Sequence, residues 1–118
     1  MLLVVRGGAT DTDLVRTDAV RFRRRYPRWG RYGISAYFAI DDQEIDVLCE
    51  TRLERFDTVA IFTRSDLVLA GVKVVPTFRR PHATLANAEL ELLIDGLRSC
   101  APRIASNRFH RGPGGVNP

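Results

Sequence analysis

Lysine and cysteine are nearly absent from this 118-residue chain, which contains one lysine and two cysteines. Two cysteines exclude a disulfide framework, because small disulfide-stabilised domains carry several pairs. Cys49 and Cys100 stand among apolar residues of predicted helices, and we expect buried free thiols in a cytoplasmic protein. No apolar run approaches the roughly 20 residues that cross a bilayer. Met1–Val5 has no basic flank and predicts no signal peptide.

Familiar cofactor and metal motifs are also missing. The two histidines are 28 residues apart, and no Cys-x-x-Cys or His-Glu-x-x-His spacing occurs, so we expect no metal site. Arg6-Gly7-Gly8 lacks the third glycine of a dinucleotide-binding fingerprint. A Walker loop and a nucleophile elbow are absent as well. The sequence therefore predicts no resident cofactor.

Positive charge is present in excess and is unevenly placed. The net charge is +4, and 17 of the 18 cations are arginines. Seven arginines lie between residues 14 and 33, whereas seven carboxylates lie between residues 41 and 57. GC-rich coding accounts for the choice of arginine over lysine but not for this clustering. One basic face suits an anionic partner such as RNA.

Alternating strand and helix patterns predict an α+β (mixed α/β) fold in one small domain, residues 1–102. The order is β-α-β-α-β-α-β-(β)-α, with helices packed on a mixed sheet. Strands are expected at Leu2–Val5, Ile34–Ile40, Thr58–Thr63, Val72–Val75 and, at the sheet edge, His82–Ala86. The first helix is expected to end before Pro27. Residues 103–118 are rich in glycine and proline, and we expect a flexible tail.

His82 follows Phe78-Arg79-Arg80-Pro81 at the start of the last predicted strand. Neighbouring arginines lower the pKa of a histidine and keep it neutral, as a general base requires. In a metal-free ribonuclease, Arg79, Arg80 and Arg6 would hold the scissile phosphate, and Tyr32 would be a spare proton donor. The alternative is a structural histidine in a basic loop.

The segment from Arg23 to Gly33 alternates arginines with aromatic rings. Rings that stack on bases, beside cations that hold phosphates, are typical of proteins that bind single-stranded RNA. The candidate nucleic-acid-binding residues are Arg23, Arg24, Arg25, Arg28, Trp29 and Arg31. The alternative is a helix end with solvated arginines and a tryptophan packed on the core.

Arg6 ends the first predicted strand in front of two glycines. An arginine there reaches a ligand, and the glycines let that ligand approach the backbone. The alternative is a simple turn in which Arg6 pairs with Asp11 or Asp13.

Two resemblances follow from these motifs. Arg6-Gly7-Gly8, Gly33-Ile34-Ser35 and Thr77–His82 together resemble small uncharacterised proteins of high-GC bacteria, whose size and basic character are similar to those of toxins from toxin–antitoxin pairs. This resemblance covers about Val5–Leu97 and implies a cognate antitoxin as partner.

The Arg-Gly at the end of the first strand and the Gly-x-Ser of a later strand are similar to motifs of ADP-ribosyltransferases. That resemblance implies that Arg6 holds a phosphate or ribose of NAD and that Ser35 supports its ribose. It also implies a catalytic glutamate in a late strand. Glu89-Leu90-Glu91 matches the family's glutamate motif in sequence but falls in a predicted helix. Ala36 and Tyr37 stand where the family's serine motif has a second hydroxyl residue.

We therefore predict a small basic toxin-like protein that acts on RNA as a metal-independent ribonuclease. An ADP-ribosyltransferase-like toxin using NAD is the alternative function. A binding module for nucleic acid or an acidic protein, without catalysis, is the third.

Overall fold

The computed structural model describes residues 1–8 and 11–111. Its helices are α1 (Thr12–Arg25), α2 (Asp42–Thr51), α3 (Arg64–Leu69) and α4 (Leu90–Ser99), with a 3₁₀ turn η1 (Pro27–Trp29). Its strands are β1 (Leu3–Gly7), β2 (Tyr32–Ala39), β3 (Thr58–Thr63), β4 (Lys73–Pro76), β5 (His82–Asn87) and β6 (Arg103–Ser106). The predicted α+β class is confirmed. Among the described residues, no helix has the length and apolar character needed to cross a membrane.

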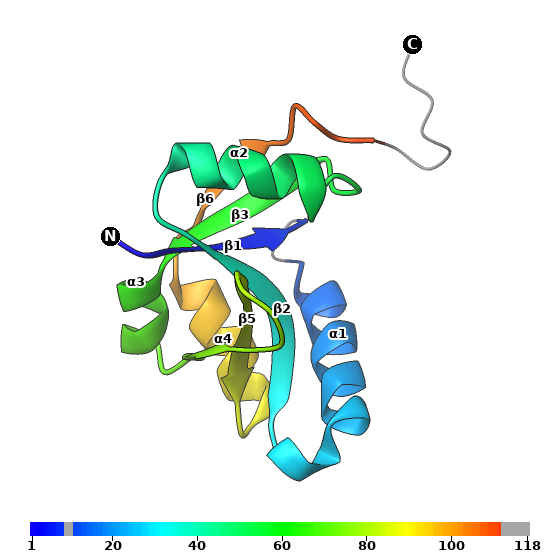
Figure 1. Ribbon diagram of the computed structural model, residues 1–118. Coiled ribbons are helices and arrows are strands. Elements are labelled where there is room, and N and C mark those ends of the chain that lie inside the picture. The colour runs from blue at the N-terminus through cyan, green and yellow to red at the C-terminus, as the bar shows by residue number, and fades with distance from the viewer. Residues whose placement is uncertain (9–10, 112–118) are drawn as a thin grey trace.

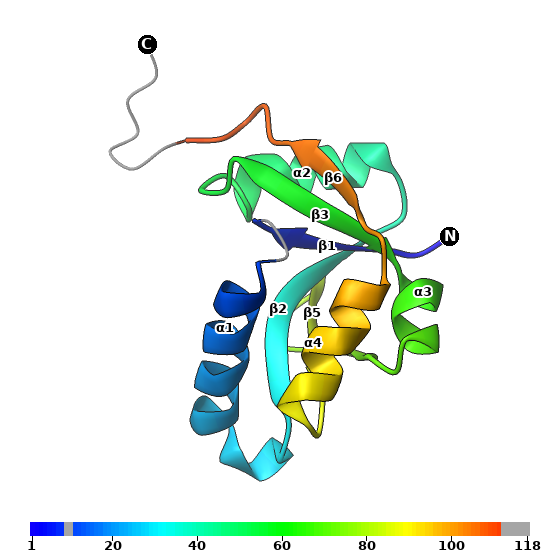
Figure 2. The same cartoon turned by 180° about the vertical axis from the view of Figure 1, so that it is seen from behind.

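The six strands form one sheet in the order β4-β5-β2-β1-β3-β6, and every neighbouring pair is antiparallel. The sheet is therefore not the mixed one that the alternation of strands and helices predicted. The reason is the path of α1, which runs beside β2 in both views rather than crossing back over β1 (Figures 1 and 2). The chain reverses at η1, so β2 returns antiparallel to β1.

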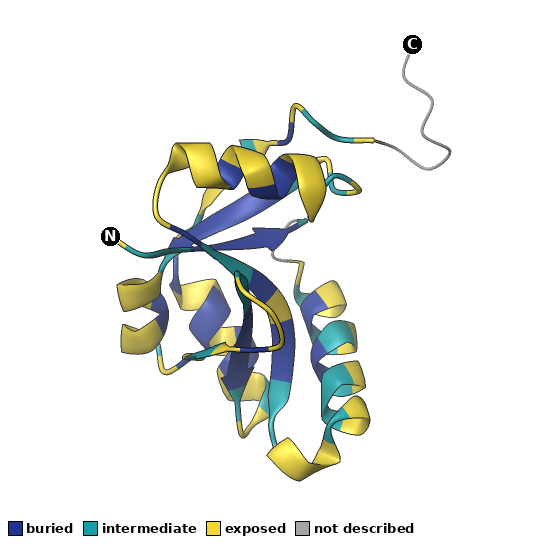
Figure 3. Cartoon of the chain, viewed as in Figure 1, coloured by how far each residue is buried: buried dark blue, intermediate teal, exposed yellow. Residues whose placement is uncertain are grey.

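Strand β2 joins two halves of the sheet. Its last residues, Tyr37–Ala39, pair with β1, whereas Tyr32–Tyr37 pair with β5. One core cluster contains Val4, Ile34, Leu85 and residues of α1, α3 and α4. A second cluster packs α2 over β1 and β3. Figure 3 shows buried residues along the strands and exposed residues on the outer sides of α1 and α2.

Two expectations about the later strands differ from the structure. β5 lies between β4 and β2, so β4 is the edge strand in its place. Residues Arg103–Ser106, expected in the tail, pair with β3 as β6, and the folded unit extends past residue 102. Asn107 anchors the chain beyond β6 through buried hydrogen bonds. Residues 112–118 lie outside the described part of the chain.

Candidate functional site

A cleft of 1050 Å³ opens where β1 and β2 diverge. Strands β1, β2 and β5 form its floor, α1 forms one wall, and the segment between α2 and β3 forms the other. Two carboxylates, Asp18 and Asp57, line it. The arginines and aromatic rings that line it are Arg6, Arg21, Arg25, Arg52, Arg55, Phe22, Tyr26, Tyr37, Phe56 and Phe78. The cleft is therefore positively charged and rich in flat apolar surfaces.

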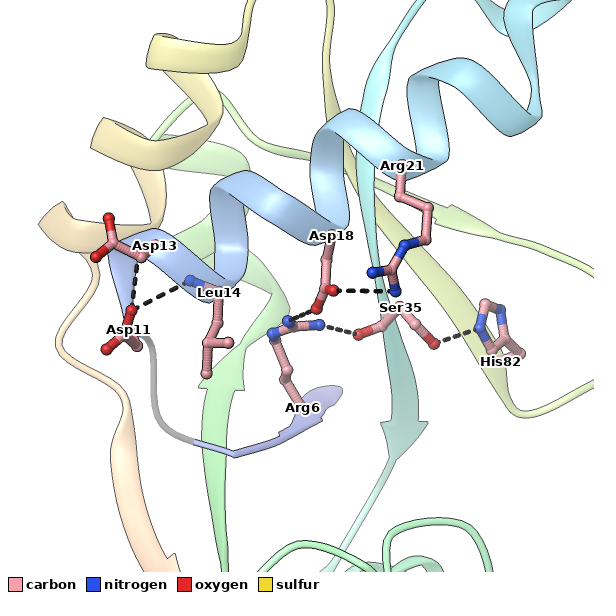
Figure 4. Close-up of polar contacts among 8 residues, drawn as sticks. All are labelled: Arg6, Asp11, Asp13, Leu14, Asp18, Arg21, Ser35 and His82. Carbon is pink, nitrogen blue, oxygen red and sulfur yellow. Dashed lines mark hydrogen bonds and ion pairs between the residues drawn. The ribbon is translucent and has the colours of Figure 1, made fainter.

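Arg6 is buried at the floor, with 8% of its surface exposed. Its Nη1 donates to the Ser35 carbonyl at 3.0 Å, and its Nη2 pairs with Asp18 Oδ2 at 2.8 Å. The buried Nε has no partner among the described residues. Figure 4 shows the guanidinium held between α1 and β2. Arg6 thus pairs with Asp18 and not with Asp11 or Asp13, the partners named in the alternative interpretation.

Ser35 and His82 face each other across the β2–β5 pair, with Ser35 Oγ 2.6 Å from His82 Nε2 (Figure 4). On its other side, His82 Nδ1 lies 2.8 Å from Thr77 Oγ1, which lies 2.8 Å from Thr84 Oγ1. Thr77 and Thr84 are buried. The imidazole is therefore held at both nitrogens, and only its Ser35 side opens to the cleft.

Burial lowers the pKa of His82 below its usual 6.5, a hydrogen bond with the Thr77 backbone opposes this, and the positive charge of Arg52 adds to the lowering. The imidazole is therefore neutral near pH 7. A neutral ring has one donor and one acceptor nitrogen. In the tautomer whose Nδ1 donates towards Thr77, Nε2 is the acceptor that faces the Ser35 hydroxyl. This is the geometry of a base beside a hydroxyl group.

Aromatic rings line the cleft on both sides. A side chain on Gly7 would overlap the ring of Phe56, so this glycine lets Phe56 close the upper wall. On the opposite side, the Phe78 ring lies 5.1 Å from His82 and 5.7 Å from Tyr26. Tyr37 contacts the His82 ring edge-on at 5.2 Å. These faces suit the flat rings of a nucleotide.

The structure brings together only some of the predicted site residues. Arg6, Ser35 and His82 meet at the cleft floor, and Arg25 lies on its rim. Arg79 and Arg80 do not line the cleft; they are exposed in the turn before β5, so they are not beside Ser35 as the ribonuclease hypothesis required.

Other predicted residues also lie outside the cleft. Tyr32 packs against the core. Trp29 contacts Phe22 edge-on and Tyr26 in a tilted arrangement, and it remains 42% exposed. The arginines predicted to bind nucleic acid that do not line the cleft are Arg23, Arg24, Arg28 and Arg31. Helical geometry separates Arg23 and Arg24 from Arg25, because successive residues of a helix point about 100° apart.

Sequence reasoning missed several cleft residues. Asp18 of α1 and Thr84 of β5 line the cleft but belong to no motif that the sequence analysis singled out. Arg52 and Arg55, at the end of a predicted acidic helix, were a visible signal for a second basic wall. Glu91 pairs with Arg16 on the surface and, like Glu89, does not line the cleft.

Comparisons with protein-family models, with curated proteins and with solved structures find no match to this chain. Among residues 1–8 and 11–111, no three histidine, cysteine or acidic side chains gather as a metal site would require.

Proposed function

We propose that this protein binds a NAD-type dinucleotide in the cleft and transfers its ADP-ribose to an acceptor. One observation carries the proposal: Arg6, Ser35 and His82, from three different strands, meet at the cleft floor. The resemblance to ADP-ribosyltransferases implies that Arg6 and Ser35 bind the dinucleotide. Arg6 Nη1 donates a hydrogen bond of 3.0 Å to the Ser35 carbonyl. The ribonuclease hypothesis relied on Arg79 and Arg80, which are exposed in the turn before β5 and do not line the cleft.

The residues of the cleft fit such a dinucleotide. A volume of 1050 Å³ is at the upper end of cofactor sites. The buried Arg6 Nε, at the floor, has no partner among residues 1–8 and 11–111. Arg21 and Arg25 on one wall and Arg52 on the other suit the two phosphates. A bound dinucleotide supplies a ribose whose bond to nicotinamide can be broken by displacement.

The chain's own groups would divide the work. Arg6, fixed by Asp18 and the Ser35 carbonyl, would hold a ribose hydroxyl or phosphate oxygen. The Ser35 hydroxyl would bind a ribose hydroxyl. His82 would accept the acceptor's proton at Nε2, while Thr77 fixes the ring orientation. In this proposal, His82 takes the late-strand position that the resemblance gives to a glutamate.

Thermal unfolding with and without NAD tests the binding step. A ligand that binds only the folded state at 100 times its Kd stabilises it by about 2.7 kcal/mol. We expect stabilisation by NAD and transfer of label from NAD carrying labelled adenylate. A control variant, Arg98→Gln on exposed α4, should respond like the wild type. NAD that neither stabilises nor labels would refute the proposal.

A metal-independent ribonuclease remains the second candidate, because the neutral His82 beside Ser35 and Tyr37 also suits removal of a 2′-hydroxyl proton. In this case Arg25 and Arg52 would replace Arg79 and Arg80 at the phosphate. RNA cleavage would persist in chelator and leave 2′,3′-cyclic ends. Cleavage without any response to NAD would favour this candidate over ADP-ribosyl transfer.

The proposal also includes a toxin-like role in the cytoplasm. Cys49 and Cys100 are buried free thiols, as a reducing compartment favours. Induced expression of the wild type in a bacterium should arrest growth and deplete NAD, whereas His82→Ala should not. Co-expression of a cognate antitoxin should restore growth. Normal growth with abundant folded wild-type protein would refute the toxin role.

A further inference from the structure

Two basic segments that are far apart in sequence lie side by side at the lower edge of the cleft. One is the end of α1 with η1, and the other is the turn between β4 and β5. The Phe78 ring of the turn contacts Tyr26 at 5.7 Å, which brings the segments together. We call their arginines the basic rim: Arg25, Arg28, Arg79 and Arg80. All four are exposed.

The charge of the basic rim is not neutralised by the protein. Within the described part of the chain, ion pairs involve Arg6, Arg16, Arg21, Arg103 and Arg108, and none involves an arginine of the rim. The acidic face of α2, in contrast, is paired with Arg103 and Arg108. The rim is therefore an unpaired cationic surface that complements a polyanion.

A row of aromatic rings crosses the same surface. Trp29 contacts Tyr26 at 5.9 Å, Tyr26 contacts Phe78, and Phe78 contacts His82 at 5.1 Å. Trp29 is 42% exposed and Phe78 is 66% exposed. The row leads from the end of α1 to the reactive floor, so a chain of stacked bases can follow it into the cleft.

Phe78 is the least ordinary ring of the row. Its φ of 57° is left-handed, which is costly for a bulky side chain. The conformation presents a large apolar ring to solvent, where it contributes little to the core. Strained conformations are retained mainly at binding and catalytic sites. Stacking on a base is a use that requires this exposed face.

We propose that single-stranded RNA docks on the basic rim, with a base stacked on Phe78 and phosphates on the four arginines, and is the macromolecule on which the cleft acts. Rings between cations favour nucleic acid over an acidic protein, which offers no bases to stack. Ser35 and His82 at the end of the row can recognise a 2′-hydroxyl, which DNA lacks. That the RNA is the acceptor rests on the proposed function, whereas the docking of RNA on the basic rim does not depend on it.

Fluorescence anisotropy with a labelled 12-nucleotide RNA of mixed sequence tests the docking. Each phosphate contact contributes about −0.7 to the slope of log K against log salt. The variant Arg28→Gln/Arg79→Gln/Arg80→Gln should therefore flatten the slope by about 2. A matched variant, Arg64→Gln/Lys73→Gln/Arg98→Gln, removes the same charge from exposed residues elsewhere and should keep the wild-type slope.

Substitution of Phe78 tests the stacking separately. Phe78→Leu keeps an apolar side chain without a flat face and should weaken RNA binding roughly 5- to 150-fold, the usual effect of losing one stacked base. The salt slope should not change, because no cation is removed. Phe78→Trp should bind like the wild type. Equal binding by all three proteins would overturn the stacking and with it the proposal.

Competitors and NAD separate the remaining outcomes. An acidic peptide of equal charge that competes as well as RNA, or DNA of the same sequence that binds equally, would overturn the assignment to RNA. A flattened slope in the matched variant would also overturn it. The rim variant should still be stabilised by NAD. If the wild type is stabilised by NAD but does not bind RNA, this inference alone is refuted. If the wild type binds RNA but NAD neither stabilises nor labels it, the proposed function alone is refuted.

Discussion

Asn107 and Arg6 are both buried polar residues, but their surroundings differ. Asn107 is 6% exposed, and its amide nitrogen donates to the carbonyls of Cys49, Leu53 and Phe56 at 3.0–3.2 Å. Its side-chain oxygen accepts from the Phe109 amide. Every polar atom of this side chain has a partner. The network fastens the C-terminal segment to the wall that carries Arg52 and Arg55.

Arg6 is equally buried, but its hydrogen bonding is incomplete. Two of its nitrogens have partners, and the third has none within the part of the chain that the structure describes. Native proteins seldom leave buried polar atoms unpaired without a functional reason. The saturated network of Asn107 therefore serves the fold, whereas the incomplete one of Arg6 beside the cleft is consistent with the proposed ligand site.

The largest expected effect separates catalysis from stability. His82→Ala should lower turnover by roughly 10²–10⁴-fold, because a positioned base is removed. The free energy of unfolding should change by only about 1 kcal/mol or less, since the ring is partly exposed. Transfer assays and urea unfolding measure the two quantities. A variant that unfolds while its folded fraction keeps full activity would make His82 structural.

Asn107→Ala should have the opposite profile. Three carbonyls lose their donor in a buried site, and each such loss costs about 1–3 kcal/mol before relaxation. We expect a loss of about 2–4 kcal/mol in the free energy of unfolding. Activity per folded molecule should remain near that of the wild type. Asn107→Asp keeps the acceptor but not the donors and should lose nearly as much stability. Unchanged urea midpoints would contradict the saturated network.

Arg6→Lys sharpens the comparison at the cleft floor. Lysine keeps the charge near Asp18 but cannot span Asp18 and the Ser35 carbonyl with a fixed planar fork. We expect the stabilisation by NAD, about 2.7 kcal/mol at 100 times Kd, to be mostly lost. Differential scanning fluorimetry measures it. Full stabilisation of Arg6→Lys would mean that binding of the dinucleotide does not need the guanidinium fork.

The smallest expected effect is a pH dependence that only one network possesses. The pKa of His82 is lowered by burial, so below about pH 6.5 the unfolded state takes up its proton first. Stability should therefore fall as pH decreases through this region, and above it the contribution vanishes. His82→Gln should remove this component, whereas Asn107→Ala should not. Parallel pH profiles for wild type and His82→Gln would contradict the lowered pKa.

Local patterns were sufficient for the elements with strong signals. The apolar spacing of Val15 and Ala19, the stop at Pro27 and the β-branched run of Thr58–Thr63 fixed α1 and β3 close to their observed bounds. Local patterns did not predict β6. This strand, Arg103–Ser106, is short and mostly exposed, and it pairs only with β3. Its anchor, Asn107, is an ordinary polar residue until the fold buries it.

The sequence by itself determined the arginine-rich composition, the separation of the basic segment from the acidic segment, and the placement of Arg6 at a strand end before two glycines. Only the tertiary structure decided that Ser35 Oγ lies 2.6 Å from His82 Nε2, although the two residues are 47 positions apart in the sequence. The physical reason is the β2–β5 register, which pairs Tyr37 with His82 and puts the His82 and Ser35 side chains on one face. A slip of one residue would turn His82 to the opposite face of the sheet.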